Sequence, residues 1–432
     1  MKRAAYPSAL LLSLTLVACG GNGPDVPPAK SATPVSAAPV SEAVQNATTP
    51  APVAIESTPE ALSAQPPGAP EPIDESAAAS TKTTAVAAAT VLYVGPNGSD
   101  SNPGTQAAPF RSIVKASQVA QPGATVYVLP GTYAGGITTS KSGTASARIR
   151  YVATSKWGAR LVAPAGSTAQ HGWLNTGNYV DIIGFQIDGR EAPLWRNAIL
   201  TRASYGSINE NYIHHVAQSV PCDNNGGSAI NTTYYYYGVQ IQVERNYVHD
   251  IGAKSCKFIQ GIYHGTSGTI KNNLVLRVGY AAVHLWHDAN NIQIVNNTVG
   301  NSAVGILVGG GDFYHRSVAD NIKVSNNIVF NNGQGIAENG TVNSTDDYFN
   351  NLAWNNGVNF SVNGFNAPTA SVIKDPQFRD PVGNDFGLKS TSPAIGAGSP
   401  TNAPAIDFDG TKRPQGGRID IGVVEYVGAG AL

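Results

Sequence analysis

The chain has 432 residues, 42% of them hydrophobic, with 47 glycines, 28 prolines and a formal net charge of −1. A chain of this length can bury a large core, but so many glycines and prolines exclude a mainly helical protein. The near-zero charge gives no indication of nucleic-acid binding, and we expect no nucleic-acid partner.

Residues 1–18 predict a secretory signal peptide, because Lys2 and Arg3 precede an apolar run that ends in small residues before Cys19. The tetrapeptide LVAC resembles the lipobox of bacterial lipoproteins. That resemblance implies cleavage before Cys19 and lipidation of this residue, so that lipid chains alone hold the protein at a membrane. Gly20 follows the cysteine, and by the sorting rule of that family we expect the outer membrane, on its periplasmic or cell-surface face.

Residues 19–88 are rich in Ala, Pro, Ser and Thr and contain no aromatic residue. This composition cannot bury enough apolar surface to fold, so it predicts a disordered tether. The folded domain is then expected at 89–432. We divide it into an N-terminal cap and first coil (89–147), regular coils (148–370) and a C-terminal cap (371–432).

The folded part begins with a strand at Val91, followed by a turn rich in Gly, Asn and Pro, and by one short amphipathic helix over 112–120. A second strand, TVYV, follows. Because the first coil of a solenoid has an open edge, the helix is expected to cover it.

One phrase then returns six times, an alternating strand that ends in an asparagine. Successive asparagines are 35, 27, 24, 30 and 24 residues apart, which indicates a repeat with loop insertions. Stacked in register, their side-chain amides can bond the coils above and below, so we interpret them as structural. The six are Asn211, Asn246, Asn273, Asn297, Asn327 and Asn351.

The two ends of the domain carry longer phrases, LYVGPNGSDSNPGTQAAPFRSI near the start and DFGLKSTSPAIGAG with DFDGTKRP and DIGVVEY near the end. With the asparagine repeat, these phrases resemble secreted proteins of the pectate-lyase superfamily over residues 91 to about 427. The resemblance implies an all-β fold, a right-handed, single-stranded parallel β-helix with a short N-terminal capping helix. It also implies that loops before the last strand of each coil wall a substrate groove.

These loops are long in three consecutive coils, after Asp188, His215 and Asp250, and short in the next three. Insertions concentrate where binding occurs, so a cleft is predicted beside the long loops. Cys222 and Cys256 lie 11 and 10 residues after their ladder asparagines, about one strand spacing apart. In an oxidising envelope we expect them to form a disulfide.

Alternation along the last strands predicts which side chains face outward. Asn231, Tyr263 and His284 should lie outside on successive coils with Trp286 beside them, whereas His264 and His287 should point inward. Rings stack on sugar faces and cations neutralise carboxylates, so this surface suits an acidic glycan. The long loops are expected to add further substrate-binding or catalytic side chains: Trp195, Arg196, Lys254 and Lys257.

The favoured reaction is β-elimination on a uronate-containing polysaccharide, which needs a base, an acid and a neutralised carboxylate. We assign His284 or Lys257 as the base, Tyr263 as the acid, and Arg277 or Lys254 as the neutralising group. Asp250 and Arg277 lie at equivalent points of adjacent coils, so they either staple the coils or border the groove. Two alternatives remain, a glycoside hydrolase of an exopolysaccharide and a non-catalytic polysaccharide-binding or adhesion module.

No cofactor is required by the sequence. The family resemblance makes Ca²⁺ possible, although the expected groove strands carry no lysine and no tight cluster of aspartates. A weaker metal candidate combines His249 and Asp250, together with the neighbouring His214 and His215. We expect a monomer whose partners are a polysaccharide and, through the lipid anchor, a membrane.

Overall fold

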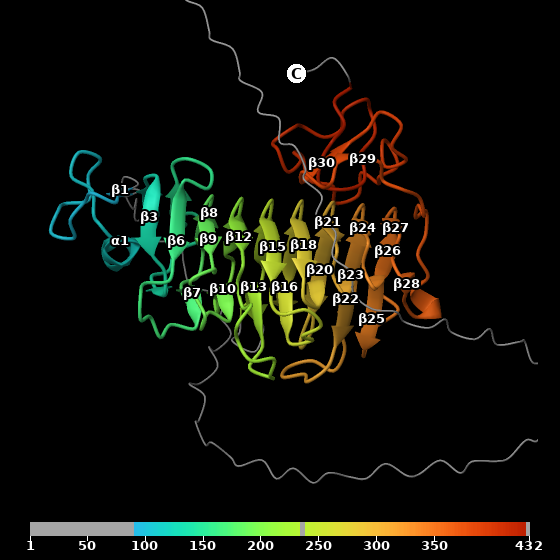
Figure 1. The fold of residues 1–432 in the computed structure, drawn as a ribbon, viewed down its shortest axis with the longest axis horizontal. Helices are drawn as coiled ribbons and strands as arrows, with labels where there is room; N and C mark the ends of the chain where they lie inside the picture. The colour runs from blue at the N-terminus through green and yellow to red at the C-terminus, as the bar shows by residue number, and fades with distance from the viewer. Residues whose placement is uncertain (1–89, 234–237, 429–432) are drawn as a thin grey trace, which may run out of the picture. The chain divides into compact units, whose positions relative to one another are not determined.

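The computed structural model describes residues 90–233 and 238–428, where nearly all regular structure is β-strand (Figure 1). The predicted signal peptide, Cys19 and the tether lie outside these residues. Within the described ranges, no helix combines the length and the apolar character needed to span a membrane.

Three parallel sheets run along the molecule. Sheet A contains β1 (Val91–Val94), β2 (Thr125–Val128), β5 (Ile149–Ala153), β8 (Val180–Ile183), β11 (Ser207–Asn209), β14 (Ile241–Glu244), β17 (Gly268–Lys271), β20 (Asn290–Val295), β23 (Asp320–Ser325) and β26 (Asp347–Phe349). Sheet B contains β3 (Gly131–Ala134), β6 (Ala159–Val162), β9 (Gln186–Asp188), β12 (Tyr212–His214), β15 (Tyr247–Ile251), β18 (Leu274–Val278), β21 (Thr298–Gly300), β24 (Ile328–Phe330) and β27 (Leu352–Trp354). Sheet C contains β4 (Ile137–Thr139), β7 (His171–Asn175), β10 (Asn197–Thr201), β13 (Gly227–Thr233), β16 (Ile259–Gly265), β19 (Ala281–Leu285), β22 (Val304–Gly310), β25 (Gln334–Gly340) and β28 (Val358–Ser361).

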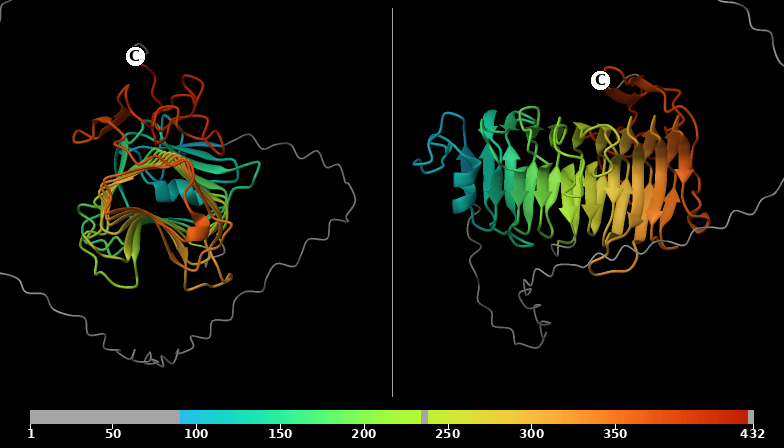
Figure 2. Two further views of the ribbon diagram at one scale, coloured as in Figure 1. Left: turned by 90° about the vertical axis from the view of Figure 1, so that its right-hand side faces the viewer. Right: turned by 60° about the horizontal axis from the view of Figure 1, so that its bottom comes forward.

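Each coil takes one strand from sheet A, one from sheet B and one from sheet C, and each strand pairs in parallel with its equivalent in the next coil. Aliphatic side chains from all three sheets fill the interior; Ile270, Val275 and Val283 are fully buried there. The views in Figure 2 show the stacked coils from the end and from below. The predicted parallel β-helix is therefore confirmed.

The predicted N-terminal helix is present as α1 (Ile113–Val119). Ser112 caps its first turn, because the Ser112 hydroxyl accepts a hydrogen bond from the Lys115 amide at 3.0 Å. Ile113 and Ala116 are buried in the same core as the first coils. The helix thus covers apolar side chains that the first coil would otherwise expose to water.

The predicted asparagine ladder lies at the turn from sheet A to sheet B. The side-chain nitrogen of each of the first five ladder residues donates to the side-chain oxygen of the next, at distances of 2.9–3.1 Å. The same nitrogens also donate to backbone carbonyls, such as Asn273 Nδ2 to Val243 O at 2.8 Å. All six asparagines are fully buried, so the ladder satisfies groups that the turn would leave without partners.

A left-handed residue precedes each ladder asparagine, and this explains the paired asparagines of the later coils. The backbone φ is 53° at Asn272 and 56° at Asn296 and Asn326. Asparagine tolerates this conformation better than most residues, because its short side chain bonds locally.

Beyond Val372, the C-terminal segment does not lie over the open end of the solenoid, where the cap was predicted. It lies along the side of the later coils (Figures 1 and 2), where Asn272 Nδ2 donates to Ile406 O and Asn296 Nδ2 donates to Asp420 O. Its antiparallel pair, β29 (Phe378–Asp380) and β30 (Asp385–Leu388), belongs to an apolar cluster with outward residues of sheet B.

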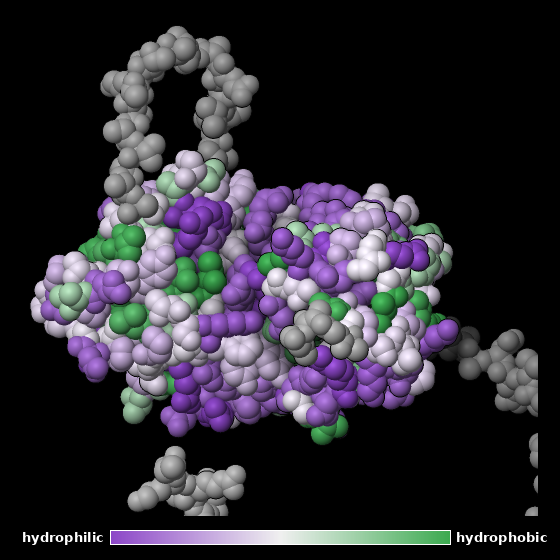
Figure 3. All heavy atoms as spheres, turned by 90° about the horizontal axis from the view of Figure 1, so that it is seen from above, coloured by the Kyte–Doolittle hydropathy of each residue, from purple (hydrophilic) through white to green (hydrophobic). Residues whose placement is uncertain are grey.

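The C-terminal segment lies along the side of the coils because outward positions of sheet B carry apolar side chains there. Tyr247 stands there in one coil, but Leu274 replaces it in the next, and Ile328 and Leu352 follow further along. This apolar strip needs a cover, which the C-terminal segment supplies. The molecular face seen from that side is largely hydrophilic, with small separate apolar spots (Figure 3).

The last coil is followed by a short 3₁₀ helix, η2 (Gly364–Asn366), and then by isolated parallel bridges. Phe349 bridges to Thr369 and Leu352 bridges to Val372. These bridges extend sheets A and B by one partial rung, so the chain partly covers its own open edge before it turns back along the side.

Candidate functional site

The outer face of sheet C carries the predicted column of side chains. Asn231 pairs in register with Tyr263, Tyr263 with His284, and His284 with Leu307. The aliphatic residue before each of them, such as Ile262 or Val283, is fully buried. The alternation of these strands was therefore interpreted correctly, and the column lies on the outside of the solenoid.

This column forms the floor of a pocket of about 450 Å³. Two of the three long loops contribute to its walls, through Asn224–Gly227 and through Lys257 and Phe258. The opposite wall contains Trp286, His287 and Asp312. The predicted association between long loops and a cleft holds for these two loops.

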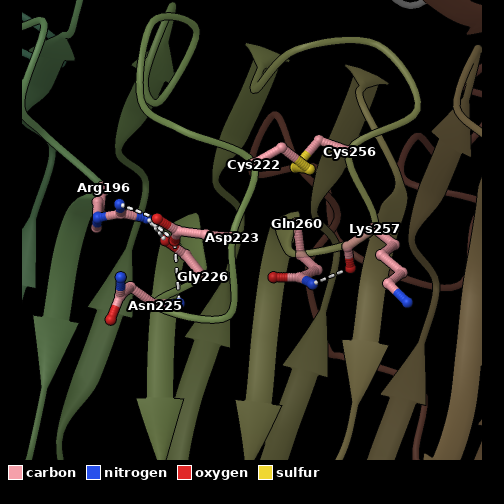
Figure 4. The surroundings of a disulfide bond; sticks show 8 residues. All are labelled: Arg196, Cys222, Asp223, Asn225, Gly226, Cys256, Lys257 and Gln260. Atoms are coloured by element: carbon pink, nitrogen blue, oxygen red, sulfur yellow. Dashed lines mark hydrogen bonds and ion pairs between the residues drawn. A yellow bond between two sulfur atoms is a disulfide. The ribbon is translucent and has the colours of Figure 1, made fainter.

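The two loops are joined by the predicted disulfide between Cys222 and Cys256, whose Cα atoms are 5.6 Å apart (Figure 4). Pocket residues follow each cysteine directly along the chain. Gln260 Nε2 donates to Lys257 O at 3.0 Å, and the Lys257 amine extends away from the disulfide. The cross-link therefore restrains the backbone on which Lys257 is mounted.

His284 is the most unusual group in the pocket. Its side chain is 8% exposed, and neither ring nitrogen has a hydrogen-bond partner among the described residues. Rings of Tyr263 and Trp286 lie 5.2 and 5.7 Å away between centroids. Burial lowers the pKa of His284 to about 3, and the nearby His287 adds to the shift. At neutral pH the pocket thus contains a neutral imidazole with one donor and one acceptor available to a ligand.

The wall opposite the long loops was predicted only in part: Trp286 was expected there, but the loop that carries Asp312 was missed from the sequence. Asp288 is fully buried, and its carboxylate accepts from the backbone amides of His315 and Arg316 at 3.0 and 2.9 Å. These bonds hold the loop after β22, from which Asp312 Oδ2 accepts from Trp286 Nε1 at 3.4 Å. The length of the loop at 311–319 could have indicated this wall, because the equivalent loops in other coils are shorter.

His264 is fully buried as predicted, with Nδ1 2.8 Å from Thr232 Oγ1, and burial lowers its pKa to about 4. The prediction for His287 is wrong. β19 ends at Leu285, and His287 adopts a left-handed φ of 53°, so its ring turns into the pocket wall instead of continuing the alternation.

Trp195 does not bind substrate in the way predicted. It is 1% exposed and packs in the core, where its ring lies against the positions that a β-carbon of Gly135 or Gly172 would occupy. A large ring reaches the interior there because both neighbours lack a β-carbon. Arg196 lies next to the pocket, but its guanidinium is engaged by Asp223 at 2.9 and 3.1 Å (Figure 4). It orders the loop that carries Asn225.

Arg277 and Lys254 line a second pocket that contains neither Tyr263 nor His284. The predicted single constellation is therefore divided. Arg277 pairs with Asp250 at 2.8 and 3.1 Å, the stapling arrangement of the two that the sequence allowed. Burial acts to raise the pKa of Asp250, but hydrogen bonds from Arg277 and His249 outweigh it, and the net pKa is lowered.

The weak metal candidate is a real cluster. His215, His249 and Asp250 offer ligand atoms that all lie within 4.8 Å of one another, and His214 stacks on His249 with ring centroids 5.4 Å apart. Burial lowers the pKa of both His214 and His249. By contrast, the lining of the pocket around His284 includes one carboxylate, Asp312, among the described residues. Ca²⁺ takes six to eight oxygen ligands, so these residues do not fit a calcium site there.

The stacked parallel coils define the class: the chain is a right-handed parallel β-helix protein. A family profile described as "Pel9A-like, right handed beta helix region" matches residues 92–255. The crystal structure of pectate lyase Pel9A is similar over 78% of this chain and 96% of that chain, with a TM-score of 0.55 and 19% identity. The complex of XylC with xylose covers 63% of this chain and 70% of that one, at 15% identity and a TM-score of 0.46.

A curated protein, "Uncharacterized protein YwoF" of Bacillus subtilis (strain 168), is 49% identical over 53 residues. That match spans 12% of this chain and 11% of the relative. At 19% identity, the similarity to pectate lyase Pel9A supports the fold alone.

Proposed function

We propose that this protein is a polysaccharide lyase that cleaves a uronate-containing glycan by β-elimination in the pocket around His284. The observation that carries the proposal is the buried His284 ring, which has two nitrogens without partners and lies on a floor shared with Tyr263. An unsatisfied buried polar group costs stability, so it marks a place where a ligand supplies the missing bonds. The fold similarity to pectate lyase Pel9A supports the same class of substrate.

In the proposed reaction, the unprotonated His284 nitrogen removes the proton from C5 of the uronate. The electron pair of that C–H bond forms the C4=C5 double bond while the C4–O bond breaks, and Tyr263 gives its hydroxyl proton to the leaving oxygen. Lys257 replaces Arg277 and Lys254 as the neutralising cation, because it lines the same pocket. A bound carboxylate also raises the pKa of His284 from its low value, which strengthens the base when substrate is present.

A second candidate, glycan binding without cleavage, is favoured by one specific observation. With a pKa of about 3, His284 is a weak base in the free protein, yet it is well suited to hydrogen-bond sugar hydroxyls. Trp286 and Tyr263 would supply stacking surfaces in either case.

Glycoside hydrolysis is not favoured, because it needs two carboxyl groups roughly 5–10 Å apart. Asp312 is the one carboxylate among the described lining residues. Outside this pocket, the Glu338 carboxylate accepts hydrogen bonds from the Tyr348 hydroxyl at 2.8 Å and from the Asn363 amide at 2.7 Å, and so ties the last coils together.

The test is incubation of the full chain with a panel of uronate and neutral polysaccharides, followed by mass spectrometry and absorbance of the unsaturated uronate. Lyase activity gives products lighter by one water than hydrolytic ones. His284→Asn and Tyr263→Phe should abolish these products, whereas Tyr127→Phe, on the outer face of sheet A, should not. Uronate glycan retained without products indicates the binding candidate, and full activity in both pocket variants refutes the site assignment.

We also propose that lipid chains on Cys19 anchor the protein at the outer membrane and that residues 19–88 set the reach of the folded domain. The support is the LVAC tetrapeptide and the composition of the following segment. Labelling of cells with a radioactive fatty acid should mark the protein, and Cys19→Ser should lose both the label and membrane association. An unlabelled wild-type protein would contradict the anchor.

A further inference from the structure

A second group of chemically active side chains lies on the outer face of sheet B, apart from the pocket around His284. His214 and His249 pair in register on β12 and β15, and the next residue of each strand segment is His215 and Asp250. Both of these residues have a left-handed φ of 57°, which turns their side chains out of the regular alternation. His215 and Asp250 are consequently brought to the same place as His249.

Neighbouring side chains already orient the ring nitrogens. Tyr212 OH lies 2.8 Å from His249 Nε2, and His214 Nδ1 lies 2.9 Å from His215 Nδ1. These contacts leave two nitrogens for a metal ion, His215 Nε2 and His249 Nδ1, of which the second is now bonded to Asp250. His249 Nδ1 is directed at Asp250 Oδ2, at 2.5 Å. Hydrogen bonds to the far side of a ligating imidazole are the usual way in which proteins fix its tautomer and direction.

We propose that His215, His249 and Asp250 bind a divalent transition-metal ion, with Zn²⁺ the best match to the donor set. Two imidazole nitrogens and one carboxylate oxygen make a three-ligand site that leaves a coordination position open. His249 is 7% exposed, so its place in the site is defined before any ion arrives. Asp250 also lines the second pocket, which connects the site to solvent.

Binding requires a small rearrangement. Zn–N and Zn–O bonds of about 2.0–2.2 Å in a tetrahedron separate two ligand atoms by roughly 3.3 Å. The His249 Nδ1 to Asp250 Oδ2 distance must therefore open from 2.5 Å, and the wider separations in the cluster, of up to 4.8 Å, must close. Asp250 and His215 are only partly buried, and both can move at their χ angles without disturbing the core.

Arg277 is the main competitor for the ion, because its guanidinium holds both oxygens of Asp250. Its side chain is 39% exposed and can turn into water when the ion takes the carboxylate. A cation beside the site lowers metal affinity. Removing Arg277 should then strengthen metal binding, a result that no ion-pair ladder would produce.

The experiment measures Zn²⁺ binding to the full chain by calorimetry and Co²⁺ binding by visible absorption, in a Cys19→Ser background so that this thiol does not bind the metal. One Zn²⁺ should bind per chain. His215→Ala and Asp250→Asn should each weaken binding by at least about tenfold, and Arg277→Gln should tighten it severalfold. His315→Ala, on the loop after β22, is the matched histidine control and should bind as the parent does.

Urea unfolding of each variant separates loss of the site from loss of the fold. His215→Ala keeps the Asp250–Arg277 pair, so its stability should be close to that of the parent. The proposal is overturned if Zn²⁺ does not bind, if His215→Ala binds it as tightly as the parent, or if Arg277→Gln destabilises the protein without increasing affinity. Because the glycan pocket is separate, none of these outcomes affects the test of the proposed lyase activity.

Discussion

Replacing Asn273 by aspartate tests the asparagine ladder without changing the shape of the side chain. Asn273 Nδ2 donates to Val243 O at 2.8 Å, to Asn297 Oδ1 at 3.0 Å and to Lys271 O at 3.1 Å. An aspartate keeps the acceptor oxygen of this side chain but loses all of these donors. Because Asn273 is fully buried, water cannot replace them.

The size of the effect follows from the number of lost donors and from the buried charge. A protonated aspartate restores one hydrogen-bond donor. In acid, the hydrogen bonds that are still missing should therefore lower the free energy of unfolding by about 2 kcal/mol. Burial raises the pKa of the new carboxyl in the folded state, and a rise from about 3.9 to about 7 adds about 4 kcal/mol. The new carboxyl group is neutral, and therefore tolerated, when the pH is below its pKa in the unfolded chain. It destabilises the fold increasingly as the pH rises toward its raised pKa in the folded state.

We therefore expect the free energy of unfolding to fall by about 4–6 kcal/mol at about pH 7 and by about 2 kcal/mol at about pH 4, relative to the parent at each pH. Urea unfolding followed by tryptophan fluorescence measures both values. Asn355→Asp is the control, because Asn355 is exposed and its change should stay within about 0.5 kcal/mol. A loss below about 1 kcal/mol at neutral pH, or a loss that does not shrink in acid, would refute this account of the ladder.

Three further comparisons of variants have defined outcomes. The pKa of His284 is lowered to about 3 in the folded protein, so His284 is protonated in the unfolded chain first as pH falls below about 6.5. Between about pH 7 and pH 4, the free energy of unfolding of the parent should therefore fall by about 3 kcal/mol more than that of His284→Asn, as measured by urea titration. An equal fall in both proteins would contradict the burial of His284. The disulfide joins cysteines 34 residues apart, so replacing both by alanine should lower the free energy of unfolding by about 3–4 kcal/mol. The same double variant should retain glycan more weakly. Unchanged retention would show that the pocket loops need no cross-link. Trp195→Ala should lower the free energy of unfolding by about 3–5 kcal/mol and change the glycan affinity of the folded protein little, because Trp195 lies in the core. Trp286→Ala should instead weaken glycan binding, measured by calorimetry, with a small effect on stability.

The candidate site shows where local pattern suffices and where it does not. Alternation placed Tyr263 and His284 on adjacent strands and on the outside, because side-chain direction in a strand depends only on position. It could not show that His284 is enclosed, since its burial comes from Trp286 and from loops far away in the sequence. The alternation also failed at His287, where a left-handed residue ends the strand.

The loop residues were predicted with less success, because a loop has no fixed periodicity. Lys257 and Lys254 are three residues apart, yet they line different pockets. Trp195 turned into the core because glycines made room for it. Leu274 and Leu352 are apolar residues that the sequence already contains, and they explain why the C-terminal segment packs along the side of the coils. Only the structure shows that both face outward on sheet B and would be exposed to water without that segment.

Sequence alone was enough to predict the solenoid, its asparagine ladder and its disulfide, because these depend on residue types that recur at equivalent points of neighbouring coils. The capping helix was predictable from its own short amphipathic pattern. The tertiary structure decided which of the polar side chains share a pocket. That outcome depends on how long loops fold against the coils, and on contacts between residues that no repeat relates. The same contacts separate the pocket of His284 from the cluster of His215, His249 and Asp250, so the two candidate sites are distinct.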